Sequence, residues 1–249
     1  MSPSLPLTAV HRRRLREVWR SAGWPCQDMI EVELLAAGLL QRVRDDGGRE
    51  TLRVSDAGID VLAATLHGNR KARDAHEALV ARVVLEQQRA GRIAWCGLSL
   101  RARIADAAHA KGERWAMAMP DVFSVRQTSV AGYLQPEVHE IKVRRADLLC
   151  DLRHEAKRAA YLGMAGACWY VLADGIGDAD DVPPDCGVMV ARGENFAALD
   201  VLRCAPTRAM PFEAGLPFAV WMTLARATPV VQGDGDEQRH LGEPPHAAI

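Results

Sequence analysis

Apolar residues follow two spacings along this chain, and their order predicts an α/β fold for its larger part. Stretches with the spacing of one helix face alternate with short runs that have the period of a strand. From residue 76 onward the predicted order is helix, strand, two paired strands, helix and strand: His76–Ala90, Arg92–Ile104, Asp121–Arg126, Val138–Val143, Ala146–Ala165 and Ala167–Leu172. The last strand is continuously apolar and follows a crossover helix, which predicts a parallel strand covered on both faces.

The two strands in the middle of this region are expected to pair as an antiparallel hairpin that turns near residues 130 and 131. This register places Asp121 opposite Glu140, with Cβ atoms about 4.5–5.5 Å apart. Lys142 lies two residues beyond Glu140 and therefore shares its face of the sheet. Because directly opposed like charges destabilise a sheet, this pair of carboxylates indicates a site for a divalent cation.

The remaining segments are expected to be more peripheral. Asp106–Trp115 is a polar connection, Gly187–Ala191 and Ala198–Leu202 predict a closing hairpin, and Phe212–Ala227 predicts a last helix. Beyond Thr228, glycine, proline and charged residues dominate, so we expect disorder there.

The first 70 residues predict a small separate domain. Two helices, Leu7–Ser21 and Gln27–Ala37, precede a hairpin over residues 39–44 and 50–54 and a third helix from Ser55 to about Leu66. His67–Ala75 is polar and basic, and is either a linker or the end of that helix. The expected domains are therefore 1–70, 71–210 and, as a helix with a disordered tail, 211–249.

This N-terminal order of helix, helix, hairpin and helix resembles a winged-helix module. It departs from that pattern because the space before the hairpin holds one helix where a helix-turn-helix needs two. The resemblance implies that arginines of the hairpin contact DNA phosphates: Arg42, Arg44, Arg49 and Arg53. The alternative is a packing or dimerisation module with a solvated basic hairpin, and a homodimer is compatible with the sequence.

Composition restricts the compartment and the partners. The 249 residues carry a net charge of −1, so any surface for a polyanion must be local. Six cysteines without a Cys-x-x-Cys pair argue against a zinc site and for reduced thiols. No apolar run approaches the ~18 residues of a membrane span. Only four of the 31 basic residues are lysines, a bias typical of GC-rich bacterial coding. We expect a cytoplasmic, nucleoid-associated bacterial protein without membrane contact.

The central motif resembles that of the PD-(D/E)XK nuclease superfamily: Pro120-Asp121, then eighteen residues, then Glu140-Ile141-Lys142. The resemblance implies an α/β restriction-endonuclease-like core, a mixed sheet flanked by helices. It also implies that Asp121 and Glu140 hold Mg²⁺ or Mn²⁺ and that Lys142 positions or activates the attacking water. Glu77, on the preceding helix, matches by position a further carboxylate ligand. The alternative for Glu77 is a solvated residue in a first helical turn.

A narrower likeness covers residues 140–170. The Arg-Ala-Asp-Leu that follows the motif and the Cys-Trp-Tyr-Val strand resemble MmcB-like DNA-repair proteins. On the helix between them, Lys157, Arg158 and Tyr161 are candidate nucleic-acid-binding residues. The spacing of Lys157 and Tyr161 is similar to a Gln-x-x-x-Tyr element of one branch of the superfamily, with Lys in place of Gln. The alternative is a solvated basic face.

These observations predict a metal-dependent DNA nuclease that hydrolyses phosphodiester bonds, with a role in DNA repair or processing. A second hypothesis is a nucleic-acid-binding repair or regulatory protein that keeps the same scaffold and does not cut. A third is a regulator built on the N-terminal module, in which Glu140 and Lys142 form only an exposed ion pair of little energetic value.

Overall fold

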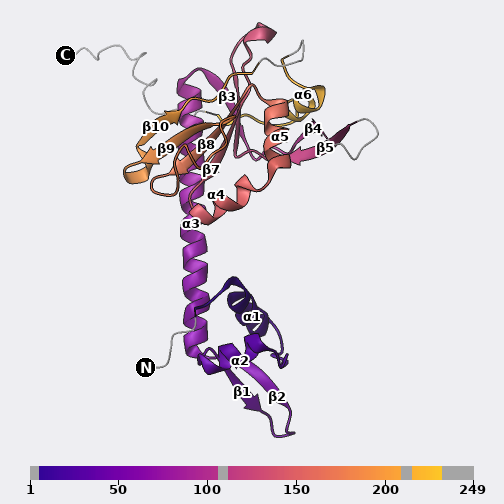
Figure 1. Cartoon of the computed structure of the whole chain (residues 1–249), viewed down its shortest axis with the longest axis vertical. Coiled ribbons are helices and arrows are strands. Elements are labelled where there is room, and N and C mark those ends of the chain that lie inside the picture. Colours follow the sequence, from indigo (N-terminus) through magenta and orange to yellow (C-terminus); the bar gives the residue numbers. More distant parts are fainter. Residues whose placement is uncertain (1–5, 106–111, 209–214, 232–249) are drawn as a thin grey trace, which may run out of the picture. The chain divides into compact units, whose positions relative to one another are not determined.

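The structure is a computed structural model that describes residues 6–105, 112–208 and 215–231. The chain divides into an N-terminal unit, Met1–Arg73, and a C-terminal unit, Asp74–Ile249 (Figure 1). Sequence analysis had set this boundary at residue 70. Among the described residues, no helix is both long enough and apolar enough to cross a membrane.

The N-terminal unit contains the two helices, the hairpin and the third helix that the sequence predicts. Helices α1 (Ala9–Arg20) and α2 (Met29–Ala36) precede the antiparallel strands β1 (Leu40–Arg44) and β2 (Glu50–Val54), and helix α3 begins at Asp56. Their apolar faces share one small core: Leu15, Val18, Leu34, Leu39, Leu40, Leu52 and Leu62. Gly23 has a φ of +73°, and a Cβ there would lie 2.0 Å from the carbonyl oxygen of Leu52. Only glycine lets the loop after α1 approach the hairpin this closely.

Helix α3 is longer than expected. It runs without a break from Asp56 to Arg89, 34 residues, whereas the sequence analysis began a new helix at His76. Of the two alternatives for His67–Ala75, a linker or a continuation of the helix, the second is observed. Residues 66–71 are exposed on every side, so they show no apolar periodicity that would mark a helix. The stretch contains no proline, and the backbone hydrogen bonds of the helix continue through it.

A six-stranded mixed sheet forms the centre of the C-terminal unit, in the order β10-β9-β8-β7-β6-β3. The strands are β3 (Arg92–Cys96), β6 (Val122–Arg126), β7 (Glu137–Lys142), β8 (Ala167–Ala173), β9 (Gly187–Arg192) and β10 (Ala198–Arg203). β8 is parallel to β7 and to β9, and the other pairs are antiparallel. The expected α/β class, the parallel strand after the crossover and the closing hairpin are confirmed.

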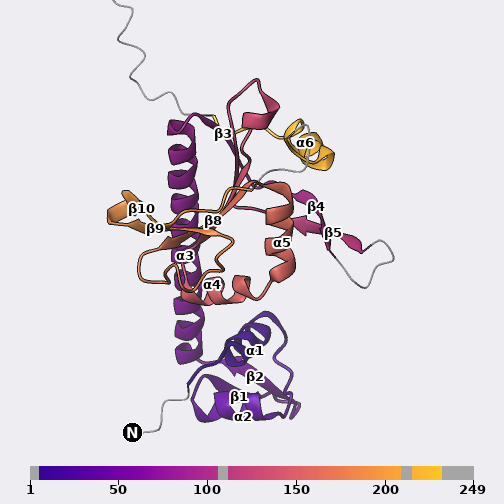
Figure 2. The ribbon, with the colours of Figure 1, turned by 45° about the horizontal axis from the view of Figure 1, so that its top comes forward.

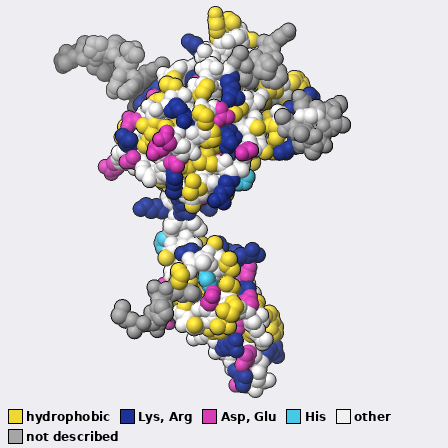
Figure 3. All heavy atoms as spheres, viewed as in Figure 1, with side chains coloured by type: hydrophobic (Ala, Val, Ile, Leu, Met, Phe, Trp, Pro, Cys, Tyr) yellow, Lys and Arg dark blue, Asp and Glu magenta, His cyan; other side chains and the backbone are white. Residues whose placement is uncertain are grey.

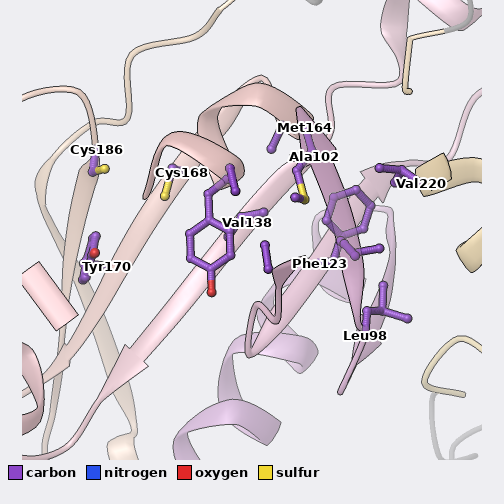
Figure 4. Close-up of a cluster of buried hydrophobic side chains, with 14 of the residues drawn as sticks. Leu98, Ala102, Phe123, Val138, Met164, Cys168, Tyr170, Cys186 and Val220 are labelled. Carbon is purple, nitrogen blue, oxygen red and sulfur yellow. The ribbon is translucent and has the colours of Figure 1, made fainter. Parts of the chain in front are cut away.

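Helices cover both faces of this sheet (Figures 1 and 2). On one face, Leu79, Val83 and Val84 of α3 pack against Val122 and Ile141. The other face is covered by α5 (Glu155–Met164), α6 (Phe218–Leu224) and a separate hairpin of β4 (Leu100–Ala105) and β5 (Glu113–Ala118). Figure 4 shows part of this larger core, in which side chains of the strands and of α5 and α6 meet.

Two segments differ from the sequence prediction in this unit. The expected strand Arg92–Ile104 is two strands, because Gly97 adopts a φ of +67° between β3 and β4 and lets the chain turn out of the main sheet. The end of the expected polar connection belongs to β5, while residues 106–111 lie outside the described residues.

The helix expected over Ala146–Ala165 is also two elements, α4 (Arg145–Leu152) and α5. They are separated at His154, whose φ of −94° and ψ of 69° are not helical. The last expected helix is confirmed only as α6. Residues 209–214, where it was expected to begin, and residues 232–249 of the expected disordered tail lie outside the described residues.

Candidate active site

The register of β6 and β7 sets the position of the two central carboxylates. Val122 pairs with His139 and Ser124 with Glu137, as the sequence analysis predicted, and one further step places Asp121 opposite Glu140. Asp121 stands just before β6, where its side chain continues the ladder: the backbone N–H of Ile141 donates to Asp121 Oδ2 at 2.7 Å. This contact fixes one carboxylate oxygen at the end of the sheet.

Glu140 lies on the face of β7 that α5 covers, and only 3 % of its side chain is exposed. Oε1 accepts hydrogen bonds from the ammonium groups of Lys142 and Lys157, the latter at 2.6 Å. Oε2 accepts one from the hydroxyl of Tyr161 at 2.7 Å. The carboxylate is therefore held by three donors from a neighbouring position on its own strand and from helix α5.

Asp151 of α4 is a second carboxylate in this cluster, and the sequence analysis did not select it. Its Oδ1 lies 2.6 Å from Lys157 Nζ and 3.5 Å from Lys142 Nζ, and Tyr170 of β8 donates to Oδ2 at 2.8 Å. The sequence offers two signals for these residues: Asp151 interrupts the apolar side of a helix, and Tyr170 is the one hydroxyl-bearing residue of an otherwise non-hydroxylated strand, β8.

We call these six side chains the ion cluster: Glu140, Lys142, Asp151, Lys157, Tyr161 and Tyr170. Its two carboxylates and two ammonium groups balance in charge, and its phenols satisfy the remaining acceptors. Apolar residues of similar volume often replace a buried ion pair without loss of stability. A buried ion cluster is therefore weak evidence for stability.

The break between α4 and α5 allows Asp151 and Lys157 to contact each other. Asp151 and Lys157 are six residues apart, a separation that places side chains on different faces of an unbroken helix. Because the helix stops at Leu152 and restarts at Glu155, the two charged groups meet at 2.6 Å. The single helix of the sequence prediction would have separated them.

Proton positions in the cluster follow from burial and from neighbouring charges. Burial acts to lower the pKa of Lys157, but the adjacent Glu140 and Asp151 outweigh it and raise that pKa. Burial acts to raise the pKa of Asp151, but Lys142 and Lys157 outweigh it and lower that pKa. Burial and the charge of Glu140 raise the pKa of Tyr161, which keeps its hydroxyl protonated and donating.

Asp151→Asn is expected to destabilise the protein at pH 7 more than at acidic pH. The pKa of Asp151 in the folded state lies below its ordinary value of 3.8, so its ionised form stabilises the fold above that value. This contribution is lost as pH falls through the folded-state pKa. Thermal unfolding of both proteins from pH 7 downward should show the difference in midpoint shrinking below about pH 4. A constant difference would contradict the charge contacts of Asp151.

His76 of α3 is a further residue that the sequence analysis missed. Its Nε2 lies 3.3 Å from Asp121 Oδ1. The hydrogen bond to Asp121 raises the pKa of His76 against the opposing effect of burial, and the charges of Lys142 and Glu140 also act on it. The signal available in the sequence was a histidine directly before Glu77, which was itself a predicted ligand.

Glu77 is exposed beside His76. Within the described ranges, no three or more His, Cys, Asp or Glu side chains gather as a group that could hold a metal ion. Glu77, Asp121 and Glu140 are therefore not assembled into a three-ligand site. What the arrangement provides is a pair of carboxylates on neighbouring strands.

The three candidate nucleic-acid-binding residues of α5 differ in exposure: Tyr161 is buried, and Lys157 and Arg158 are partly exposed. Lys157 lies over the ring of Tyr161 at 5.5 Å, on one helix face as predicted, but both side chains contact Glu140. Tyr161 is fully buried, and Arg158 donates to the carbonyl of Leu152 at 3.2 Å. Lys157, with 29 % of its side chain exposed, and the partly exposed Arg158 could also meet a ligand phosphate.

In the N-terminal unit, hairpin arginines contact acidic side chains. Arg42 lies 3.0 Å from the buried Glu31 of α2, and Arg44 lies 2.7 Å from Glu50. Arg49 pairs with Asp45 at 3.6 Å, and Arg53 is exposed. On the face shown in Figure 3, basic and acidic side chains are interspersed over this hairpin.

Comparison with known proteins gave no match to a family model, to a curated protein or to a solved structure.

Proposed function

We propose that the C-terminal unit is a metal-dependent nuclease that hydrolyses phosphodiester bonds of DNA, as in the PD-(D/E)XK superfamily that its central motif resembles. The observation that carries the proposal is the register of β6 and β7, which brings Asp121 opposite Glu140 while Lys142 contacts Glu140. Two carboxylates and an ammonium group at one end of a sheet can serve an anionic substrate, a cation and an attacking water together.

The order of the elements supports the same proposal. Helix α3 precedes the antiparallel strands β3, β6 and β7, and the crossover through α4 and α5 leads to the parallel strand β8. The resemblance in sequence implies this order of helix, three strands, helix and strand for the nuclease core. In this order Asp121 begins the second of the three strands and Glu140 lies on the third.

The donor set fits a magnesium ion that is completed by water and substrate. Mg²⁺ is usually bound by one or two carboxylates, with several waters and with phosphate oxygens. Asp121 Oδ1, near His76, and Glu140 Oε2, which accepts from Tyr161, are the oxygens with the fewest protein donors. A bound Mg²⁺ would supply an acidified water and would offset the charge that develops on the phosphate.

The protein's own groups would orient the reaction. Lys142 would place a positive charge beside the attacked phosphate and orient the water, and Tyr161 would hold the Glu140 carboxylate in one orientation. Asp151 would act through others, as a positioning residue, because it holds Lys157 and approaches Lys142. Tyr170 would in turn fix Asp151.

A second candidate function is nucleic-acid binding without cleavage. The observation that favours it is the number of donors on Glu140: both ammonium groups and the Tyr161 hydroxyl already contact this carboxylate. If those contacts persist with DNA bound, Glu140 has one weakly occupied oxygen left for an ion.

A cleavage assay decides between the two. Purified full-length protein is incubated with single-stranded, nicked, branched and duplex DNA in Mg²⁺ or Mn²⁺, with EDTA and Ca²⁺ as controls. The nuclease proposal expects cleavage that EDTA abolishes and that added Mg²⁺ restores. Binding to the same DNA without cleavage in either metal would instead support the second function.

Lys142→Ala is expected to slow cleavage far more than it weakens metal binding, because the ammonium acts on water and phosphate. Lys142→Arg is not expected to restore the rate, since a planar guanidinium cannot replace a compact charge in contact with Glu140. Rates at saturating Mn²⁺ are measured beside calorimetric Mn²⁺ titrations. A large loss of metal affinity with an unchanged saturated rate would contradict this role for Lys142.

For the N-terminal unit, the ion pairs of its hairpin favour a packing or dimerisation module over phosphate contact. Full-length Arg42→Gln/Arg44→Gln is therefore expected to keep the wild-type salt dependence of DNA affinity. Each lost phosphate contact would lower the slope of log K against log salt by about 0.9. Fluorescence anisotropy from low to high salt measures the slope. A fall in this slope close to that expected for two lost phosphate contacts would show that Arg42 and Arg44 contact DNA.

A further inference from the structure

A cavity of about 520 Å³ opens directly beside Asp121. One wall is the face of α3 that carries Val80, Ala81, Val84 and Leu85, and another is formed by the residues that immediately precede Asp121. The volume lies within the range of about 300–1,000 Å³ that is usual for small-ligand sites. Because Asp121 itself lines the cavity, a group bound there would lie next to the proposed reaction centre.

Val230, in the segment after α6, also lines the cavity, and two hydrogen bonds hold its backbone. The N–H of Val230 donates to the carbonyl of Ala94 on β3 at 2.8 Å, and the side-chain amide of Gln88 donates to the carbonyl of Val230 at 2.8 Å. These two bonds tie the segment after α6 to the free edge of β3 and to α3. The cavity is thus lined by α3, by the residues before Asp121 and by this hydrogen-bonded segment, so a ligand would meet it already formed.

The chemistry of the walls selects the kind of group that fits. The lining is mainly apolar, with Met119 and Pro120 beside the aliphatic residues of α3. The polar lining residues include His76, Gln88 and the two carboxylates Glu77 and Asp121. Carboxylates in the lining disfavour a phosphate inside the cavity, whereas an uncharged flat group with apolar faces and a polar edge is compatible with it.

We propose that this cavity receives an unpaired nucleobase of the nucleic acid whose phosphate lies at Asp121 and Glu140. The inference rests on the proposed function and specifies its substrate class. A base that is stacked in a duplex cannot enter such a cavity without leaving the stack, which costs a few kcal/mol. The preferred substrate is therefore single-stranded DNA or DNA with an unpaired base at the site of action, rather than a continuous duplex.

Filling the cavity tests the proposal. Ala81 lines the cavity and is exposed, so Ala81→Trp should occupy the space without disturbing the core. Ala78→Trp is the matched control, because Ala78 is also exposed on α3 but does not line the cavity. Circular dichroism checks that both variants of the full-length protein fold.

Affinities are measured in Ca²⁺ for a single-stranded oligonucleotide, for the same sequence as a duplex and for a duplex with one mismatch. We expect the wild type and Ala78→Trp to bind the single strand at least about 10-fold more tightly than the duplex. Ala81→Trp should lose most of that preference. The proposal would be overturned if Ala81→Trp and Ala78→Trp showed the same preference for the single strand over the duplex. It would also be overturned if the wild type bound the continuous duplex more tightly than the single strand.

A second measurement uses the unsubstituted chain. Ultraviolet crosslinking of an oligonucleotide that carries 5-iodouracil should label Met119, whereas labelling confined to other parts of the chain would overturn the proposal. Neither measurement depends on turnover. The hypothesis of a nucleobase cavity and the hypothesis of DNA hydrolysis can therefore fail separately. Selective binding and labelling without cleavage would support the cavity and contradict hydrolysis. If Ala81→Trp cleaves DNA with unchanged rate and substrate preference, hydrolysis would be supported and the nucleobase cavity contradicted.

Discussion

Asp121→Asn is expected to lower Mg²⁺-dependent DNA cleavage by at least about 100-fold, while the protein stays folded. The substitution removes the charge that would bind the cation, a contribution of several kcal/mol to transition-state stabilisation. The Asn carbonyl oxygen can still accept the hydrogen bond from the Ile141 N–H, so the end of the β6–β7 ladder should persist. Initial rates at saturating DNA and increasing Mg²⁺ provide the measurement.

Asp147→Asn is the control for this experiment. Asp147 is an exposed carboxylate on α4, so its loss should leave the rate within about twofold of the wild type. If folded Asp121→Asn cuts DNA as fast as the wild type does, Asp121 has no place in the reaction centre. The register that brought it opposite Glu140 would then be a structural feature alone.

Glu140→Ala is expected to cost about 3–5 kcal/mol of the free energy of unfolding, as well as cleavage activity. The third hypothesis from the sequence treats Glu140 and Lys142 as an exposed ion pair of little energetic value. The structure indicates otherwise, because Glu140 is buried and is the counter-ion of Lys142 and Lys157. Its removal leaves two ammonium groups in a mostly buried cluster with only Asp151 to balance them.

Urea unfolding of Glu140→Ala and of Glu86→Ala separates this effect from an ordinary loss of charge. Glu86 pairs with Arg82 on the surface of α3, and 45 % of its side chain is exposed, so its replacement should cost no more than about 1 kcal/mol. The combined variant Glu140→Leu/Lys142→Met should recover part of the loss, since it removes an unpaired charge. Equal stability of the two single variants would contradict the buried network.

The sequence was sufficient for features that depend on strand periodicity. Alternation along Asp121–Arg126 and Val138–Val143 identified the two strands, and a turn placed near residues 130 and 131 set the register that the structure shows. The continuous apolar run of β8 likewise identified a strand that is buried on both faces.

Features that depend on local breaks or on distant contacts could not be predicted in this way. The exposed middle of α3 lacks any apolar periodicity, and the non-helical His154 lies inside a stretch that is helical on both sides. Asp151 and His76 gain their importance only from partners that the tertiary fold supplies, Lys157 in one case and Asp121 in the other. Neither partnership has a fixed spacing in sequence that could have revealed it.

All six members of the ion cluster come from one contiguous segment, the strand–helix–helix–strand unit between Glu137 and Ala173. The loops that must close to form it are short, and the entropy cost of closing a loop rises with its length. Short sequence separations between contacting residues also favour rapid folding. The cluster can therefore assemble together with this β–α–β unit early in folding. For the same reason, removal of this one segment would remove the whole network at once.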